Sequence, residues 1–162
     1  MTDFESITPQ FSSWSTQGDP AWIPVNLSMV TYGPMNATSG DYAAGSNGSV
    51  QPGTLSYIRS QFWDIPQVVR NFSVSFDRWN SFDLQDKSGI EYSVNNGQTW
   101  SEMDSWSGVS QNWETDQYLI DSIVQGFNKI GFRFYVNTSS NSSSDVGLFI
   151  DTFNLSNQGE PL

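Results

Sequence analysis

Hydrophobic and polar residues alternate in several short stretches of the chain, which is the pattern of β-strands with one buried face. Residues 71–77 alternate in this way, and so do residues 89–94. Residues 129–136 repeat the pattern, with the apolar side chains on one face and Arg133 and Tyr135 on the other. No stretch carries the apolar stripe of an amphipathic helix, so the pattern predicts a protein built from strands.

One tight turn is marked by the dipeptide Asn96-Gly97, which lies between two strand-like segments. Asn and Gly adopt the positive φ angles that a hairpin turn requires, so we expect residues 88–95 to pair with residues 98–103. Residues 33–54 are rich in turn-forming residues and predict loops with one short strand around Tyr42. Many short strands separated by turns favour an all-β fold, a two-sheet antiparallel β-sandwich of the jelly-roll type.

The length of 162 residues suits a single jelly-roll domain over 1–162, with its core from about residue 3 to residue 156 and a frayed tail at 157–162. The chain has no Cys and no His, which excludes disulfides, thiol or histidine catalysis and the usual zinc ligands. Its net charge of −11 makes nucleic acid and anionic membranes poor partners. No apolar run approaches the roughly 20 residues of a membrane span, so no membrane insertion is expected.

A carboxylate interrupts the last strand-like stretch, VGLFIDTFNL at 146–155, where Asp151 directly follows Ile150. An unpaired charge is costly to remove from water, so Asp151 requires a partner if it is buried. Three interpretations stay open. Asp151 binds a cation, or it is held by hydrogen bonds or by an arginine such as Arg133 or Arg59, or it lies exposed at a bend of the strand.

Four short motifs follow one another along the chain: DFES at 3–6, SGDYAA at 39–44, EYSVNNGQTW at 91–100 and GLFIDTFNL at 147–155. In this order and spacing they resemble the MAM-like and carbohydrate-binding-module-like jelly-roll domains that occur as accessory domains of secreted prokaryotic peptidases. The MAM domains of animal receptors carry disulfides, which a chain without Cys lacks. The resemblance therefore favours the prokaryotic branch.

The resemblance also implies a structural calcium ion as cofactor, because in such domains an acidic residue of the first strand and an Asp of the last strand commonly bind one. Carried over to this chain, these ligands are Glu5 and Asp151, with Asp41 and Asp3 as further candidates. The residue types agree with this. Because the chain has no Cys and no His, its metal ligands would be oxygen atoms, which favour calcium or another hard cation.

Aromatic residues make up 15% of the chain. Sugar rings stack on aromatic faces, so aromatic residues outside the buried phase of the strands are candidates for glycan binding. These candidates are Trp63, Trp79, Trp106, Trp113 and Tyr135. For each of them the alternative is packing in the core or in a loop, and Trp14, Trp22 and Trp100 are assigned to the core outright.

No nucleophile elbow, phosphate-binding loop or zinc-protease motif occurs in the chain, so we expect no catalytic residues and no enzymatic activity. The first hypothesis is a non-catalytic extracellular jelly-roll module for adhesion, surface assembly or accessory binding. The alternatives are a carbohydrate-binding module and a structural subunit of a surface layer, filament or virion. The expected partner is a glycan or another surface protein, including copies of the chain itself.

Glycosylation motifs of the form Asn-x-Ser/Thr favour an extracellular or cell-surface location, with a secretion leader already removed. The acceptor positions are Asn26, Asn36, Asn47, Asn71, Asn137, Asn141 and Asn154. A chain rich in Ser and Asn also forms some of these motifs by chance, so the alternative is that they are unmodified.

Overall fold

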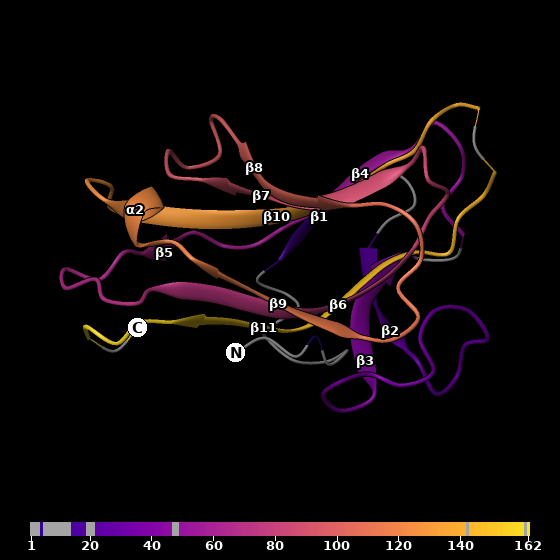
Figure 1. The fold of residues 1–162 in the computed structure, drawn as a ribbon, viewed down its shortest axis with the longest axis horizontal. Coiled ribbons are helices and arrows are strands. Elements are labelled where there is room, and N and C mark those ends of the chain that lie inside the picture. Colours follow the sequence, from indigo (N-terminus) through magenta and orange to yellow (C-terminus); the bar gives the residue numbers. More distant parts are fainter. Residues whose placement is uncertain (1–3, 5–13, 19–21, 47–48, 142, 161) are drawn as a thin grey trace.

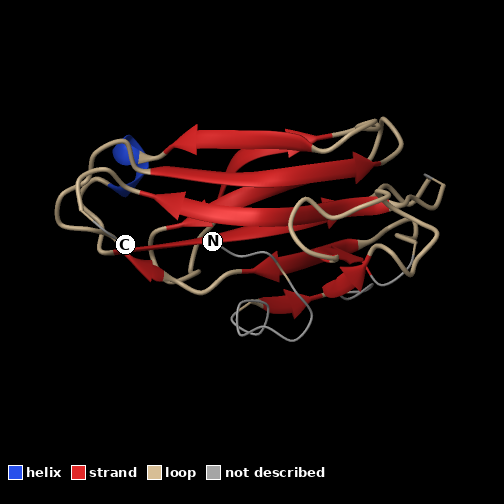
Figure 2. Ribbon diagram, turned by 90° about the horizontal axis from the view of Figure 1, so that it is seen from below, coloured by secondary structure: helices blue, strands red, loops and turns tan. Residues whose placement is uncertain are grey.

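The computed structural model of the chain describes residue 4 and residues 14–18, 22–46, 49–141, 143–160 and 162. Two antiparallel sheets lie face to face and confirm the predicted β-sandwich (Figures 1 and 2). The first sheet consists, in spatial order, of β1 (Ser15–Gln17), β4 (Leu55–Arg59), β10 (Lys129–Asn137), β7 (Lys87–Ser93) and β8 (Ser101–Trp106), with β5 (Trp63–Asp64) pairing with the start of β10. The second consists of β2 (Trp22–Asn26), β3 (Tyr42–Ser46), β11 (Gly147–Ser156), β6 (Ser73–Ser81) and β9 (Glu114–Leu119). A short helix, α2 (Asp121–Val124), connects β9 to β10.

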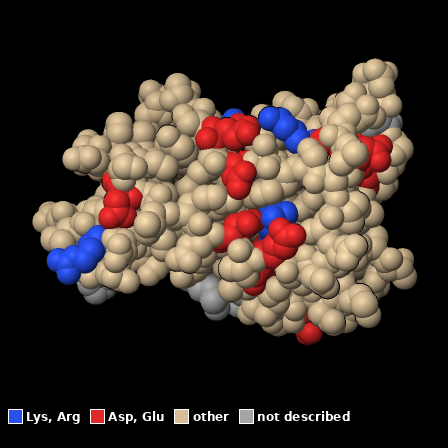
Figure 3. Space-filling model, in the orientation of Figure 1, with Lys and Arg blue, Asp and Glu red and all other residues tan. Residues whose placement is uncertain are grey.

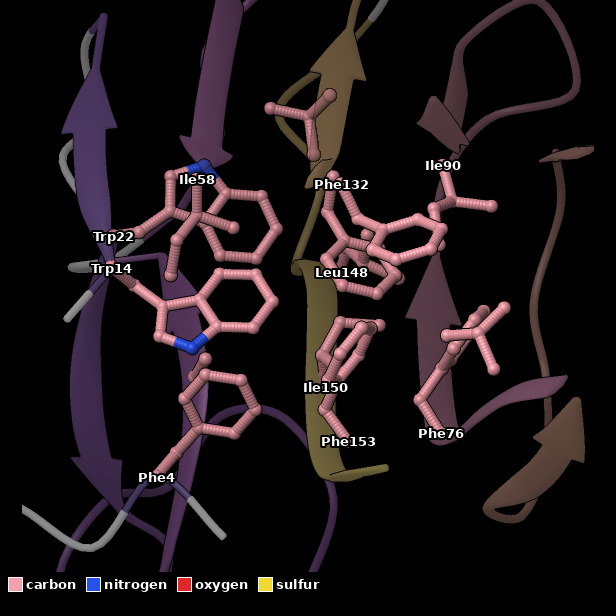
Figure 4. Packing of buried hydrophobic residues seen from close by; sticks show 14 of the residues in the cluster. Phe4, Trp14, Trp22, Ile58, Phe76, Ile90, Phe132, Leu148, Ile150 and Phe153 are labelled. Carbon is pink, nitrogen blue, oxygen red and sulfur yellow. The ribbon is translucent and has the colours of Figure 1, made fainter. Parts of the chain in front are cut away.

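The main core lies between the two sheets and is rich in aromatic rings (Figure 4). Phe76 of β6, Phe134 of β10 and Phe153 of β11 are buried and contact one another, with ring centroids 4.9 to 6.4 Å apart. Trp14 and Trp22 are also buried there, as predicted. The alternation read from the sequence is confirmed in β10, where every second residue from Ile130 to Val136 faces this core. β11 departs from it, because its register shifts between Asp151 and Asn154 and both Ile150 and Phe153 face the core.

A second, smaller hydrophobic cluster covers the outer surface of the second sheet. Phe149 of β11 lies at its centre, and Ala43 of β3 and Val25 of β2 are buried beside it. Residues 27–41 fold over these side chains, with Tyr32 6.3 Å from the Phe149 ring. β11 is therefore buried on both of its faces, which explains why its sequence reads as almost uninterrupted apolar residues.

The hairpin predicted around Asn96-Gly97 is confirmed, but its strands are shorter there than expected. β7 ends at Ser93 and β8 begins at Ser101, so seven residues form the connection. Asn96 and Gly97 do have positive φ angles of 57° and 81°. The loop is longer because side chains close it: the Ser93 hydroxyl accepts the Gly97 N–H at 2.9 Å, and the Asn95 side chain accepts the Thr99 N–H at 3.0 Å.

The connections between the sheets gather at the two ends of the sandwich (Figure 2). At one end the β3–β4 and β10–β11 connections pair through Val50 and Asp145. At the other end the tail, which was expected to fray, returns to residues 68–71, where Gln158 donates its N–H to the Arg70 carbonyl at 2.8 Å. The Asn157 amide adds a bond to the Val68 carbonyl at 2.8 Å, so the start of the tail is part of the fold.

Candidate functional site

Aromatic and charged side chains occupy the outward surface of the first sheet, opposite to the core. The register sets Arg133 of β10 beside Arg59 of β4 and Tyr135 beside Tyr57. On the other side of β10, Arg133 lies opposite Glu91 of β7. We call the surface formed by Tyr57, Arg59, Glu91, Arg133 and Tyr135 the open face.

Arg133 organises the centre of the open face. Its guanidinium carbon lies 4.1 Å from the ring centroid of Tyr57 and 4.5 Å from that of Trp100. Its Nε donates to the Glu91 carboxylate. Cation–π contact and charge-assisted hydrogen bonding both restrict a flexible side chain, so Arg133 holds the two rings in a defined arrangement.

A hollow of about 330 Å³ opens beside Arg133, between β1, β4 and β10. Its lining residues are Ser15, Thr16, Gln17, Tyr57, Arg59 and Arg133. The lining combines one aromatic ring, two guanidinium groups and several neutral polar side chains. This combination suits a polar ligand that offers a ring face and hydrogen-bond acceptors.

Two strand glycines allow aromatic rings to lie against the open face. A Cβ atom at Gly89 would come within 2.6 Å of the Tyr135 ring, and one at Gly131 within 2.7 Å of the Phe62 ring. Phe62 in turn contacts Trp100, with ring centroids 6.0 Å apart. These glycines inside β7 and β10 are the sequence signal for this arrangement, because glycine inside a strand often marks a close approach of another group.

Tyr135, one of the predicted ligand residues, does lie on the open face, although little of it is exposed to solvent. Its hydroxyl donates to the Glu102 carboxylate at 2.9 Å, and the Lys87 ammonium lies 5.7 Å from its ring centroid. Burial, followed by the hydrogen bond to Glu102, raises the pKa of Tyr135. The hydroxyl therefore remains protonated and acts as a donor at neutral pH.

The four predicted tryptophans are spread over the molecule, and each is packed against protein. Trp63 stacks on Phe153 and Trp79 contacts Phe149, with ring centroids 5.8 and 5.6 Å apart. The indole N–H of Trp113 donates to the Asn36 carbonyl at 2.6 Å. Trp106 lies 4.5 Å from the guanidinium carbon of Arg78. The structure does not bring these four into one site, and their role in ligand binding stays a prediction.

The assignment of Trp100 to the core is wrong. Trp100 is half-buried and lies over the open face, in contact with Phe62 and Arg133. The reason is the length of the β7–β8 connection, which places Trp100 in the loop and not in a strand. The hydrophobic pattern placed Trp100 inside a strand at 98–103, whereas β8 begins only at Ser101.

An ionic network closes the edge of the sandwich where β8 and β9 lie, and acidic side chains gather over these strands in Figure 3. Arg78 is buried there, with only 6% of its surface exposed. Its Nε lies 2.7 Å from Asp116 Oδ2, and its terminal nitrogens contact Glu114 and Asn80. These partners satisfy the buried guanidinium, so this edge is a structural element of the sandwich.

Asp151 is fully buried on the outer side of the second sheet, beneath residues 38 and 39. Its Oδ2 accepts the N–H groups of Thr38 and Ser39, both at 2.9 Å, and the Thr38 hydroxyl at 3.0 Å. Its Oδ1 accepts the Thr152 N–H at 2.7 Å. Burial raises the pKa of Asp151 to about 6, and these hydrogen bonds oppose the rise.

These contacts support the hydrogen-bonded interpretation of Asp151. The suggested pairing with Arg133 is not observed, because Arg133 lies on the outside of the first sheet and binds Glu91. The described groups that hydrogen-bond to Asp151 are N–H donors of residues 38, 39 and 152 and the Thr38 hydroxyl. Glu5 and Asp3 lie outside the described residues, and Asp41 is exposed, so the calcium site with Glu5 stays a prediction.

Among the seven glycosylation motifs, Asn47 lies outside the described residues. The exposed acceptors are Asn36, Asn71, Asn137 and Asn141, whereas Asn26 and Asn154 are half-buried. The Asn71 side chain donates to Gln158 at 2.8 Å. Their modification stays a prediction. Within the described residues, no helix has both the length and the apolar character to cross a membrane.

Comparison with known proteins shows the fold. No protein-family model matches the chain, and no curated protein matches its sequence. Among solved structures, TmCBM61 in complex with β-1,4-galactotriose is 18% identical with a TM-score of 0.59, and the match covers 91% of this chain and 90% of that one. The K1 cleaved adhesin domain of Lys-gingipain from Porphyromonas gingivalis W83 is 13% identical with a TM-score of 0.62, covering 97% and 96%. The K2 adhesin domain of Lys-gingipain is 16% identical with a TM-score of 0.61, covering 95% and 96%.

The chain is thus similar in fold to carbohydrate-binding modules and to gingipain adhesin domains, as part of the sequence resemblance implied. At these levels of identity the likeness extends to the β-sandwich and not to the ligand. The MAM-like part of the resemblance stays a prediction.

Proposed function

We propose that the protein is a non-catalytic extracellular binding module that takes a glycan on the open face of its first sheet. The observation that carries this proposal is the hollow beside Arg133, where the Tyr57 ring, two guanidinium groups and neutral polar side chains converge. Glycans are recognised by stacking on aromatic rings and by hydrogen bonds to hydroxyl groups, and this lining supplies both.

The charge of the hollow favours a glycan that carries a carboxylate, such as one with uronic acid residues. The whole chain has a net charge of −11, yet two arginines line this one hollow. Arg133 is already bound to Glu91, whereas no ion pair joins Arg59 to a carboxylate among the described residues. A guanidinium binds a carboxylate through two parallel hydrogen bonds, so Arg59 is the group we expect to select the acidic sugar.

The similarity in fold to TmCBM61 and to the gingipain adhesin domains supports a binding role. Adhesion or accessory binding next to a secreted enzyme would both use such a module. The seven glycosylation motifs support an extracellular or surface location.

The proposal is tested by screening the protein on an array that pairs neutral oligosaccharides with uronic-acid-containing ones, followed by calorimetry on the best ligand. We expect binding to at least one acidic glycan. Arg59→Gln is expected to weaken that binding by about tenfold or more, because a charge-assisted pair is lost.

The matched control is Arg70→Gln, which removes an exposed arginine from the loop before β6, outside the hollow. This variant should bind as tightly as the unmodified protein. Silence across the whole array would contradict the proposal, and so would an affinity that Arg59→Gln and Trp100→Ala both leave unchanged.

A further inference from the structure

Three aspartates meet at the end of the sandwich where chains cross between the sheets. Asp83 and Asp86 lie in the β6–β7 connection, and Asp145 lies just before β11. One carboxylate oxygen from each can be chosen so that the three lie within 4.8 Å of one another. Asp86 and Asp145 are both buried, and Asp83 is half-buried. None of the sequence motifs pointed to this cluster, because its members are separated by up to 62 positions in the chain.

The carboxylate of Asp145 is only half satisfied by hydrogen bonds. Its Oδ1 accepts the N–H of Asp83 at 2.8 Å. Its Oδ2 is inaccessible to solvent and has no hydrogen-bond partner among the described residues, and only 6% of the surface of Asp145 is exposed. A buried carboxylate oxygen without a donor is costly, so Asp145 Oδ2 requires a positively charged or protonated partner.

No ion pair joins Asp83 or Asp145 to a basic side chain among the described residues. Lys87 is next to Asp86 in sequence, but its ammonium pairs with Glu102 at 3.3 Å on the open face.

We propose that Asp83, Asp86 and Asp145 bind one calcium ion that joins the β6–β7 and β10–β11 connections. Oxygens bound to a common calcium at about 2.4 Å lie at most about 4.8 Å apart, which is the limit that the three carboxylates meet. The free Oδ2 of Asp145 is the ligand that such an ion would satisfy. Backbone carbonyls and waters complete the shell of a calcium ion in protein sites of this kind.

A calcium ion bound by these three aspartates would hold the two sheets together at this end of the sandwich. Asp145 also pairs with Val50 through two backbone hydrogen bonds of 2.8 and 2.9 Å, so three crossover connections meet at this point. The Asp86 carboxylate accepts the Ser139 N–H at 2.6 Å, and Asp83 accepts the N–H and hydroxyl of Ser143. Each carboxylate is thereby held in place by a loop other than its own before any ion binds.

The test uses the full chain freed of metal with a chelator and then titrated with calcium by calorimetry and by thermal unfolding. Calcium bound only by the folded state raises Tm, and we expect a rise of about 5–10 °C at a concentration about 100-fold above Kd. Asp145→Asn and Asp83→Asn should each lower the calcium affinity at least tenfold. Asp64→Asn, which alters an exposed carboxylate at the opposite end of the molecule, should leave it unchanged.

Asp151→Asn separates this site from the calcium site implied for Glu5 and Asp151, because it should leave the Asp145 site intact. Two outcomes would overturn the proposal. Calcium that neither binds nor raises Tm would mean that a proton shared between buried carboxyl groups compensates Asp145 Oδ2. Calcium that binds equally well to Asp145→Asn and Asp83→Asn would place the ion elsewhere. Should Asp145→Asn fail to fold, Asp83→Asn decides, because Asp83 is half-buried in a loop.

Discussion

The two outer surfaces of the sandwich differ in what lies over them. Residues 27–41 cover the second sheet and bury Phe149 and Asp151 beneath them. The described residues leave the first sheet open at the hollow between β1, β4 and β10, where Arg59 is exposed. One sandwich thus carries a second hydrophobic core on one side and a polar, aromatic surface on the other.

This difference teaches how a function can be located in a fold that many proteins share. A buried cluster of apolar side chains stabilises the fold, and its polar members are satisfied by the protein itself, as Asp151 is by Thr38, Ser39 and Thr152. An exposed arrangement of rings and guanidinium groups contributes less to stability and remains available for a ligand. Substitutions on the two faces should therefore affect different properties.

The largest effect on stability is expected from Phe149→Ala on the covered face. The substitution empties the centre of the second cluster, where the ring is fully buried. Replacing a buried Phe by Ala costs about 3–5 kcal/mol, because burial is lost and a cavity remains. Urea unfolding measures the loss. A cost below about 1 kcal/mol would show that residues 27–41 contribute no second core.

On the open face, Gly89→Ala is expected to cost about 1–3 kcal/mol through overpacking. The new Cβ would lie 2.6 Å from both the Asp104 carbonyl oxygen and the Tyr135 ring, so both the ring and the backbone of β8 must shift. Glycan affinity should fall together with stability, which distinguishes this change from Phe149→Ala. The matched control is Gly126→Ala, since no atom lies within 4 Å of a Cβ there, although the positive φ of 84° adds backbone strain.

Asp151→Asn on the covered face is expected to lower the free energy of unfolding by about 1–3 kcal/mol, because an amide accepts fewer hydrogen bonds than a carboxylate. The N–H groups of Thr38 and Ser39 then lose part of their acceptor. Chemical unfolding at neutral pH in a chelator measures the change without any contribution from calcium. An unchanged stability would show that residues 38 and 39 do not depend on this carboxylate.

The smallest expected effect is the pH dependence that Asp151 adds to stability. Burial raises the pKa of Asp151 to about 6 in the folded state, above the ordinary value of 3.8. The folded chain then binds more protons between these values, so the contribution of Asp151 to stability is full below about pH 4 and is lost as the pH rises through about 6. Asp77 is the carboxylate opposite Asp151 on β6, and it accepts a hydrogen bond from Thr115.

The difference in unfolding free energy between the wild-type chain and Asp151→Asn, measured in a chelator from pH 4 to pH 7, isolates this contribution. It should change in the destabilising direction for the wild type as the pH rises. A flat difference would contradict a raised pKa.

The fold could be predicted from the sequence because most strands that form the main core keep a period of two, although β11 departs from it between Asp151 and Asn154. The same pattern placed Arg133 and Tyr135 on the outward surface. It could not show that residues 27–41 return over β11, because this cover depends on contacts between distant segments. For that reason the surroundings of Asp151 stayed open in the sequence, whereas the structure buries it beneath residues 38 and 39, on the face of β11 opposite to the main core.

The candidate site was harder to predict than the fold. Only Tyr135 among the predicted ligand residues lies on the open face, whereas Trp100 was assigned to the core. A hydrophobic pattern does not distinguish a tryptophan in a loop from a tryptophan in a strand. The hollow lies between three strands from distant parts of the chain. Its two arginines are neighbours only because of the strand register, which the sequence pattern does not give.

The most direct test of the open face as the glycan site is an NMR titration that follows the indole N–H signals of the tryptophans. We expect an acidic glycan to shift the signal of Trp100, with those of Trp79 and Trp113 on the covered face unchanged. Shifts confined to Trp79, Trp113 or Trp63, with Trp100 unaffected, would contradict the location proposed for the site.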